Sequence, residues 1–183
     1  MSGVDAARPR RVQLFLRDHR VLDATAAVPD GEDLATFLAS RNRYLNLTDV
    51  EWVGTGDRVP HMALKIGTVL WASTEDGSLP LTGPPPADEV RRVEVELEGG
   101  YLIAAELQVA EGQRLTDYLH AASAFVPLRE AELRPRQKQL GDVVVNQASV
   151  QVVREIGEEG HALHRTAEDP GAEPGDGRAA GSG

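Results

Sequence analysis

Residues 93–109, Val-Glu-Val-Glu-Leu-Glu-Gly-Gly-Tyr-Leu-Ile-Ala-Ala-Glu-Leu-Gln-Val, decide the fold class of this chain. Apolar and acidic side chains alternate strictly from Val93 to Glu98, which predicts a β-strand with three apolar side chains inward and three carboxylates in water. Gly99-Gly100 predicts a two-residue hairpin turn, because glycine adopts the positive φ that such turns require. A return strand should follow, with one face formed by Tyr101, Ile103, Ala105, Leu107 and Val109.

The same pattern occurs 81 residues earlier in the chain. Residues 12–74 align with residues 93–155 without a gap, and apolar positions match apolar positions through two changes of periodicity. Examples are the pairs Leu14/Val95, Phe37/Tyr118 and Tyr44/Phe125. We interpret this match as an internal duplication, and we call two residues that lie 81 positions apart counterparts.

Each copy predicts the element order β-β-α-β-β-β. Short helices are expected near residues 32–40 and 113–122, because apolar side chains recur there at helical spacing. A third strand is expected over residues 44–52 and again over residues 125–133. In the second copy the fourth strand, residues 142–147, breaks at Ala148-Ser149 and resumes over residues 150–154. The predicted fold class is mainly β with a minor α part.

Composition divides the chain into four segments. We expect a first module at residues 10–74, a Pro-rich linker at 75–90, a second module at 91–156 and a disordered acidic tail at 157–183. Three consecutive prolines, residues 84–86, favour an extended and stiff spacer. A proline recognition motif is the alternative interpretation of the same stretch, although no basic residue flanks it.

Length, charge and composition exclude several classes of function. The chain has 183 residues, and its lack of cysteine excludes disulfides, thiolate catalysis, cysteine zinc sites and iron–sulfur clusters. Its 29 acidic and 19 basic residues give a formal net charge of −10, which repels a phosphate backbone. No apolar signal-peptide core follows Met1, and no apolar run is long enough to cross a bilayer. We therefore expect a soluble, cytoplasmic protein that does not bind membranes.

Five short strands with a tight first hairpin and a broken last strand resemble an SH3-like small barrel. Within that class each copy is similar to the Sm-like fold, with its helix between the second and third strands. The matching segments are residues 93–100, 125–133 and 143–153, together with the Tyr44-Leu45-Asn46-Leu47 segment of the first copy. The resemblance implies two tandem small barrels. It extends to an uncharacterised bacterial family of such modules, which implies no function.

The Sm-like resemblance also implies where RNA would bind. Sm-like proteins read RNA through an Asp and an Asn in one loop and an Arg-Gly pair near the last strand. Here Asn46 stands at the asparagine place, and Lys65 and Gly67 stand near the Arg-Gly place of the first copy. In the second copy Pro127 and the Asn146-Gln147-Ala148 segment stand at these places. The resemblance therefore implies RNA sites that are degraded or absent.

A cluster of basic residues in the second copy is the one local reversal of charge: Arg129, Arg134, Arg136 and Lys138. Such a patch could meet nucleic acid, an acidic partner or the acidic tail of the same chain. No aromatic residue is interleaved with it, so it offers no platform for base stacking. An ordinary solvated loop is the interpretation that we favour.

Three other sets of side chains carry candidate chemistry, and for each we favour a structural interpretation. They are His161 and His164 with Glu158 and Glu159 as a metal site, the acidic row Glu94, Glu96 and Glu98 as a cation site, and Asp117 with His120 as a general base. The first set lacks an apolar face to hold a helix, and alternation with apolar residues already explains the second. The third has no serine or second acid at a useful spacing. We expect no catalytic residue, no metal and no cofactor.

The sequence thus favours a non-catalytic interaction or scaffold protein. A barrel of about 65 residues has a marginal core, so the two copies are expected to pack together or to share one sheet. Exposed edge strands would bind a protein partner or mediate self-association. The alternative is an Sm-like RNA-binding protein that uses Asn46, Lys65, Gly67, Arg129, Arg134, Arg136 and Lys138. An enzyme ranks third, because no nucleophile, base and orienting group occur together.

Overall fold

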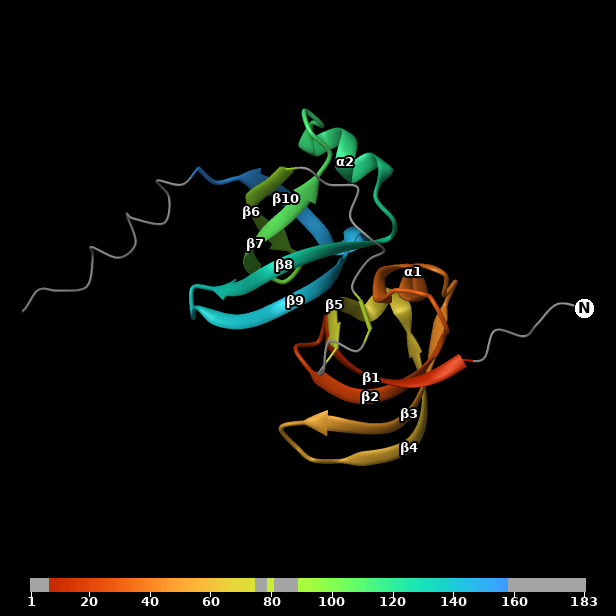
Figure 1. Cartoon of the computed structure of the whole chain (residues 1–183). Coiled ribbons are helices and arrows are strands. Elements are labelled where there is room, and N and C mark those ends of the chain that lie inside the picture. The colour runs from red at the N-terminus through yellow and green to blue at the C-terminus, as the bar shows by residue number, and fades with distance from the viewer. Residues whose placement is uncertain (1–6, 75–78, 81–88, 158–183) are drawn as a thin grey trace, which may run out of the picture.

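The structure is a computed structural model that describes residues 7–74, 79–80 and 89–157 (Figure 1). Within these residues, ten antiparallel strands form one sheet, accompanied by the short helices α1 (Leu34–Ala39) and α2 (Leu115–Ala121). The strands are β1 (Ala7–Leu16), β2 (Val21–Pro29), β3 (Tyr44–Val53), β4 (Arg58–Lys65), β5 (Val69–Thr74), β6 (Glu89–Leu97), β7 (Tyr101–Val109), β8 (Phe125–Arg134), β9 (Lys138–Asn146) and β10 (Val150–Glu155). The predicted mainly β fold class is confirmed.

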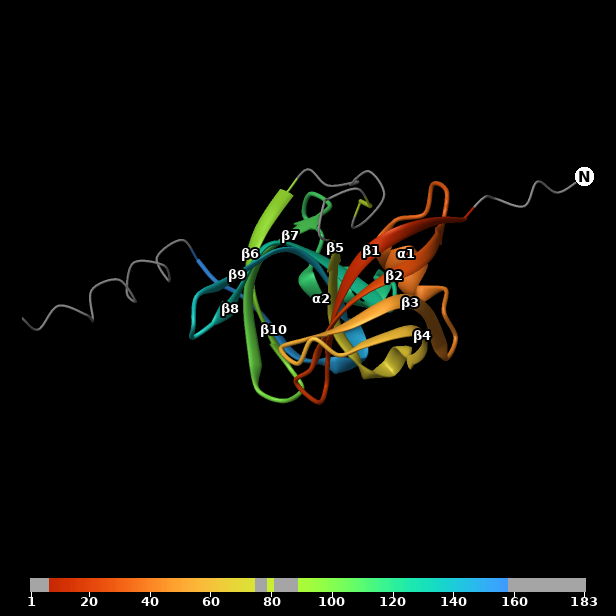
Figure 2. The same cartoon turned by 90° about the horizontal axis from the view of Figure 1, so that it is seen from below.

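The two halves of the sheet have the same strand order. Strands of the first half lie in the order β5-β1-β2-β3-β4, and strands of the second half lie in the order β10-β6-β7-β8-β9. A single antiparallel contact between β5 and β9 joins the halves into one sheet. Strands of each half are strongly curved (Figure 2). The two strands at the ends of the sheet are β4 and β10.

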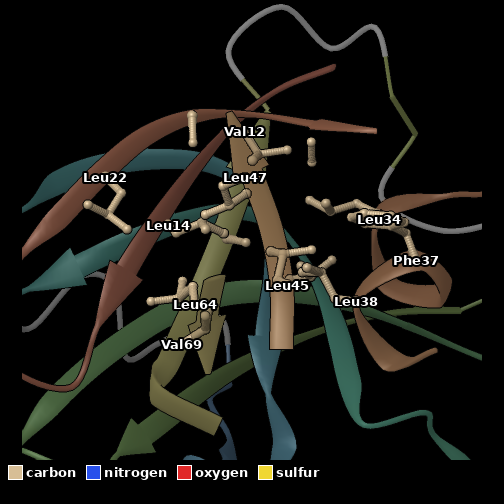
Figure 3. Packing of buried hydrophobic residues seen from close by; sticks show 14 of the residues in the cluster. Val12, Leu14, Leu22, Leu34, Phe37, Leu38, Leu45, Leu47, Leu64 and Val69 are labelled. Carbon is tan, nitrogen blue, oxygen red and sulfur yellow. The ribbon is translucent and has the colours of Figure 1, made fainter. Parts of the chain in front are cut away.

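Each half surrounds its own apolar core. In the first core, side chains from β1, β2, β3 and β5 meet the apolar face of α1, which carries Leu34, Phe37 and Leu38 (Figure 3). The alternating Leu22, Ala24, Ala26 and Val28 of β2 are all buried, as their period of two predicts. The second core has the same construction, with Ile103, Ala105, Leu107 and Val109 of β7 inside.

Turn residues account for the hairpins. Gly99 and Gly100 both have positive φ, at 86° and 79°, so glycine does form the turn between β6 and β7. The turn is one residue longer than predicted, because Leu97 pairs with Tyr101 and leaves Glu98, Gly99 and Gly100 between the strands. In the first half the turn passes through Asp18 and His19, and His19 takes the left-handed φ of 68°. Both helices fall at their predicted positions but are shorter than predicted. Asp33 caps the start of α1 by accepting the N–H of Thr36 at 2.8 Å, which fixes where that helix begins.

The segments predicted between and after the copies are described only in part. Strand β6 begins at Glu89, two residues before the predicted start of the second module. Leu79 is buried in the first core, and the carbonyl of Pro80 accepts the N–H of Leu34 at 2.9 Å. The triple proline at 84–86 and the tail from residue 158 onward lie outside the described residues. Among the helices of the described ranges, none is long and apolar enough to cross a membrane.

Candidate interaction site

The junction between β5 and β9 shows how one sheet edge of this chain binds another. Trp71 lies opposite Val145, and Ala72 lies opposite Val144. Side chains cross the junction in both directions. Phe125 and Val144 of the second half belong to the first core, whereas Leu70 and Trp71 of the first half belong to the second core. The junction is therefore a packed interface in which each half completes the core of the other.

An aromatic cluster seals one side of the junction. The ring of Phe15 stacks on Trp71 with centroids 3.8 Å apart, and Tyr101 meets both rings edge-on at 5.1 and 5.5 Å. His19 shares a hydrogen bond between its Nδ1 and the hydroxyl of Tyr101. Burial raises the pKa of the Tyr101 phenol above its ordinary value. Aromatic rings at such distances add to the energy of burial, so this cluster stabilises the junction.

Polar contacts also cross the junction. The Asn146 amide Nδ2 donates to the backbone carbonyl of Val69 at 2.9 Å, and its Oδ1 accepts the N–H of Ala148 at 3.1 Å. Arg17 forms an ion pair with Glu98 at 2.7 Å and donates to the Ser149 hydroxyl at 3.2 Å. Because Asn146 is buried, its two hydrogen bonds satisfy polar groups that water cannot reach.

Two edges of the described sheet have a neighbour on one side only. They are β4, which pairs with β3, and β10, which pairs with β6. Val152 on β10 is 44% exposed, and Tyr44, opposite Lys65 of β4, is 59% exposed. Backbone groups along such edges are free to pair with a further strand. These edges are the candidate interaction site.

One residue of the acidic row, Glu94, is not placed as expected. Glu94 was expected to face water, but it is only 9% exposed, so that expectation is wrong. Its carboxylate binds Arg134 of β8 at 3.3 Å and Arg154 of β10 at 2.7 Å. Alternation correctly places Glu94 away from the core, but it does not show that arginines from β8 and β10 cover that face. Glu96 is half-buried and Glu98 is exposed.

The RNA-binding residues implied for the first copy share one surface. Asn46 lies opposite Ala63, and Tyr44 lies opposite Lys65, so Asn46 and Lys65 are on the same exposed face of the β3–β4 hairpin. Gly67 follows in the short 3₁₀ helix of residues 66–68. In the second copy, Asn146 is the counterpart of Lys65 and is buried in the junction. The two halves of the sheet therefore do not present equivalent surfaces here.

The predicted basic cluster is spread along one hairpin. Arg134 is half-buried and forms ion pairs with Glu94 and Glu132. Arg129 is half-buried opposite Glu106 of β7, roughly 16 Å along β8 from Arg134 at about 3.3 Å per residue. Arg136 and Lys138 are exposed at the turn between β8 and β9. Only these two present their charge to solvent at the same place.

Catalytic and metal-binding candidates find little support in the described part of the chain. Asp117 and His120 both lie exposed on α2, and no group of three His, Asp or Glu side chains within the described ranges could hold a metal. A groove between the halves contains Glu106, Arg129 and Tyr118, whose pKa burial raises, but its lining contains no imidazole to act as a base. His161 and His164 lie outside the described residues.

Comparisons with known proteins add no relative. No family model matches the chain, and neither a curated protein nor a solved structure matches it.

Proposed function

We propose that this chain is a non-catalytic interaction or scaffold protein built from two duplicated small β-barrels similar to SH3-like and Sm-like modules. The equal strand order of the halves and the 81-residue match of their apolar positions support the duplication. The separate core of each half supports two modules in one sheet. Partners bind by adding a strand to an open edge.

The observation that carries the proposal is the β5–β9 junction. It is a strand addition between two modules, made by backbone pairing and completed by exchanged apolar side chains. After this pairing, the described sheet retains one unpaired edge on each module, at β4 and at β10. Edges that carry exposed apolar side chains are suited to bind a further protein strand.

RNA binding has weaker support than protein binding. Asn46 and Lys65 do share an exposed face, but Arg134 is ion-paired and the counterpart of Lys65 is buried. A net charge of −10 also opposes the approach of a phosphate backbone. RNA is therefore an outcome that the following experiment must be able to detect.

The proposal is tested by cross-linking in the cell that makes the protein. A photo-reactive amino acid replaces Gln151 on β10 or His61 on β4, both exposed, and Thr55 in the β3–β4 turn serves as the control position. We expect positions 151 and 61 to cross-link to protein, which mass spectrometry identifies, and position 55 to give none. Adducts that nuclease removes would favour the RNA alternative. No adduct from either edge would contradict the proposal.

A further inference from the structure

We infer that the partner of this chain is a second copy of itself, bound head to tail through β4 of one molecule and β10 of the next. This inference rests on the proposed function, because it takes the open edges as binding surfaces, and it adds the identity of the partner and the pairing register. The internal junction is the template. Strand β4 is the counterpart of β9, and β10 is the counterpart of β5, so the two open edges are of the same two kinds that already pair within the chain.

The template fixes the register of the contact between molecules. Within the chain, Trp71 lies opposite Val145 and Ala72 lies opposite Val144. Replacing each residue by its counterpart places Val152 opposite Leu64 of the next molecule, and Val153 opposite Ala63. Pro60, which cannot donate a backbone hydrogen bond, lies on β4 outside this paired segment.

Residues at the internal junction are buried, whereas their counterparts at the open edges are exposed, as expected for an interface whose partner is absent. Trp71 and Leu70 are 6% and 0% exposed at the junction, whereas their counterparts Val152, at 44%, and Gln151 are exposed on β10. Val144 is fully buried, whereas its counterpart Ala63 is exposed on β4. The residues that are exposed at the open edges are therefore the counterparts of residues that are buried at the β5–β9 junction.

An aromatic side chain provides independent support. Phe125 is 3% exposed because it enters the core of the other half, whereas its counterpart Tyr44 is 59% exposed. Tyrosine suits such a role, since its ring is apolar and its hydroxyl can remain at the wet rim of an interface.

The second half contains an apolar hollow that corresponds to the surroundings of Phe125. An apolar hollow in its core is lined by residues that include Val93, Val95, Leu107 and Val126. Every residue that lines this hollow is the counterpart of a residue of the first core, where Phe125 also belongs. The hollow is thus the equivalent of the environment that Phe125 occupies. Its volume of about 10 Å³ holds no more than one water molecule, so Tyr44 of the next molecule would cover its mouth rather than fill it.

The two helices show the same asymmetry. Helix α1 contacts β8 of the other half and has four buried residues, whereas α2 has none. Figure 1 shows α1 on the side of the first half that faces the second, and α2 at the outer end of the second half. In the head-to-tail contact, β3 of the next molecule takes the place of β8 and covers α2.

Polar side chains at the predicted interface are complementary. Phe15 touches Tyr101 across the junction, and their counterparts are the opposite charges Glu96 and Arg20, the latter already paired with Asp18 in its own chain. Asn146 donates to the Val69 carbonyl, and its counterpart Lys65 can donate equally to the carbonyl of Val150. Because the two surfaces differ, the contact is heterologous, and repetition produces a ring or a filament rather than an isolated two-fold dimer.

Light scattering coupled to size-exclusion chromatography tests the inference on the full chain. We expect the wild type to have a mass of at least two chains at tens of micromolar, and the variants Val152→Glu and Tyr44→Glu to be monomers. Val90→Glu is the matched control, since Val90 is 56% exposed and lies on β6 outside the residues 93–97 that pair with β10. We expect each variant to fold, because Val152 and Tyr44 are exposed and their replacement needs no repacking. Circular dichroism checks this.

Mixing the two variants tests the direction of the contact. Val152→Glu blocks β10 but retains β4, whereas Tyr44→Glu alters the β4 side but retains β10. Head-to-tail binding predicts that each variant alone is monomeric and that an equimolar mixture forms a dimer of one chain of each. Dimers of either variant alone, or a mixture that stays monomeric, would overturn the inference.

Engineered cysteines test the register, and the chain offers a background without cysteine. Ala63→Cys and Val153→Cys, placed in separate chains that are then mixed, should form an intermolecular disulfide on mild oxidation. Ala63→Cys mixed with Val152→Cys should form far less, because neighbouring residues of a strand point to opposite faces. Equal yields would contradict the register. A monomeric wild type would refute self-association, while edge-specific cross-links to another protein would still support the proposed function.

Discussion

The side-chain amide of Asn146 donates a hydrogen bond to the backbone carbonyl of Val69, 2.9 Å away, and so links β9 of one half to β5 of the other. The two residues are 77 positions apart in the chain. Asn146 is 5% exposed, so neither group of this pair has ready access to water. This contact makes the junction sensitive to the identity of one side chain.

Replacing Asn146 by alanine should destabilise the protein by about 2 kcal/mol, because the Val69 carbonyl and the Ala148 N–H both lose their partner. Urea unfolding at a fixed protein concentration measures the change. Asn46→Ala is the control, since this exposed asparagine should contribute less than about 0.5 kcal/mol. Equal effects of the two variants would contradict the role assigned to Asn146.

The counterpart residues Phe37 and Tyr118 should respond differently to truncation. Phe37 is 2% exposed in the first core, and Phe37→Ala should destabilise the protein by about 3–5 kcal/mol. Tyr118 is only half-buried on α2, so Tyr118→Ala should have a smaller effect in the same unfolding experiment. A larger effect at Tyr118 would mean that α2 is buried more deeply than the structure shows.

Glu94 should matter more than an exposed glutamate that is also ion-paired. Glu94→Gln removes one of the two carboxylates that the half-buried Arg134 binds, which should destabilise the protein by about 2 kcal/mol. Glu51→Gln is the matched control, because the Glu51–Arg58 pair at 2.6 Å is open to solvent and should contribute at most about 1 kcal/mol. Thermal unfolding of both variants separates the two cases.

Acid should weaken the contact at the start of β6. A side-chain hydrogen bond from Arg91 holds the pKa of Glu89 below its ordinary value of 4.5, and the N–H of Gly112 adds to the effect. Because the folded-state pKa is the lower one, this contribution is present above about pH 4.5 and is lost as pH falls through the folded-state value. Glu89→Gln should therefore show a smaller drop in unfolding midpoint between pH 6 and pH 3 than the wild type. Glu111→Gln, at an exposed glutamate between β7 and α2, is the control for the removal of one carboxylate.

Single-stranded RNA should bind only weakly at physiological salt, with a dissociation constant no tighter than the non-specific range of about 10⁻⁴ to 10⁻⁶ M. Fluorescence anisotropy with uridine-rich and adenine-rich oligomers at two salt concentrations measures this. Sub-micromolar, sequence-dependent binding that Asn46→Ala or Lys65→Ala abolishes would favour the RNA alternative. Binding that is lost on neutralising Arg136 and Lys138 would instead place the site at the β8–β9 turn.

Periodicity predicted much of the local structure of this protein. Alternation from Val93 onward and the glycines at 99 and 100 predicted the first hairpin of the second half, and this hairpin is present with a turn one residue longer than predicted. Helical spacing located α1 and α2 within a few residues. Such features depend on contacts between near neighbours in the chain, which the sequence displays directly.

Placement of Glu94 and of the basic residues could not be predicted in the same way. Alternation put Glu94 on the outer face of β6, but its burial depends on Arg134 and Arg154, which are 40 and 60 positions away. Arg134 looked like part of a solvated basic cluster and is instead one of the partners of this carboxylate. The opposite charges of Glu94 and these arginines indicate that they could pair, but their positions in the sequence do not show which charged residues meet.

The sequence by itself determined the mainly β class, the positions of the two hairpins and the repeated order of elements, because each of these follows from local side-chain pattern and backbone preference. Only the tertiary structure decided that β5 pairs with β9, that Phe125 enters the other core, and that Tyr44 and Val152 remain exposed. Counterpart residues have similar chemistry, so pattern alone gives them the same role. Their roles differ because the sheet pairs one edge strand of each half at β5–β9 and leaves the other edge strand of each half at its ends.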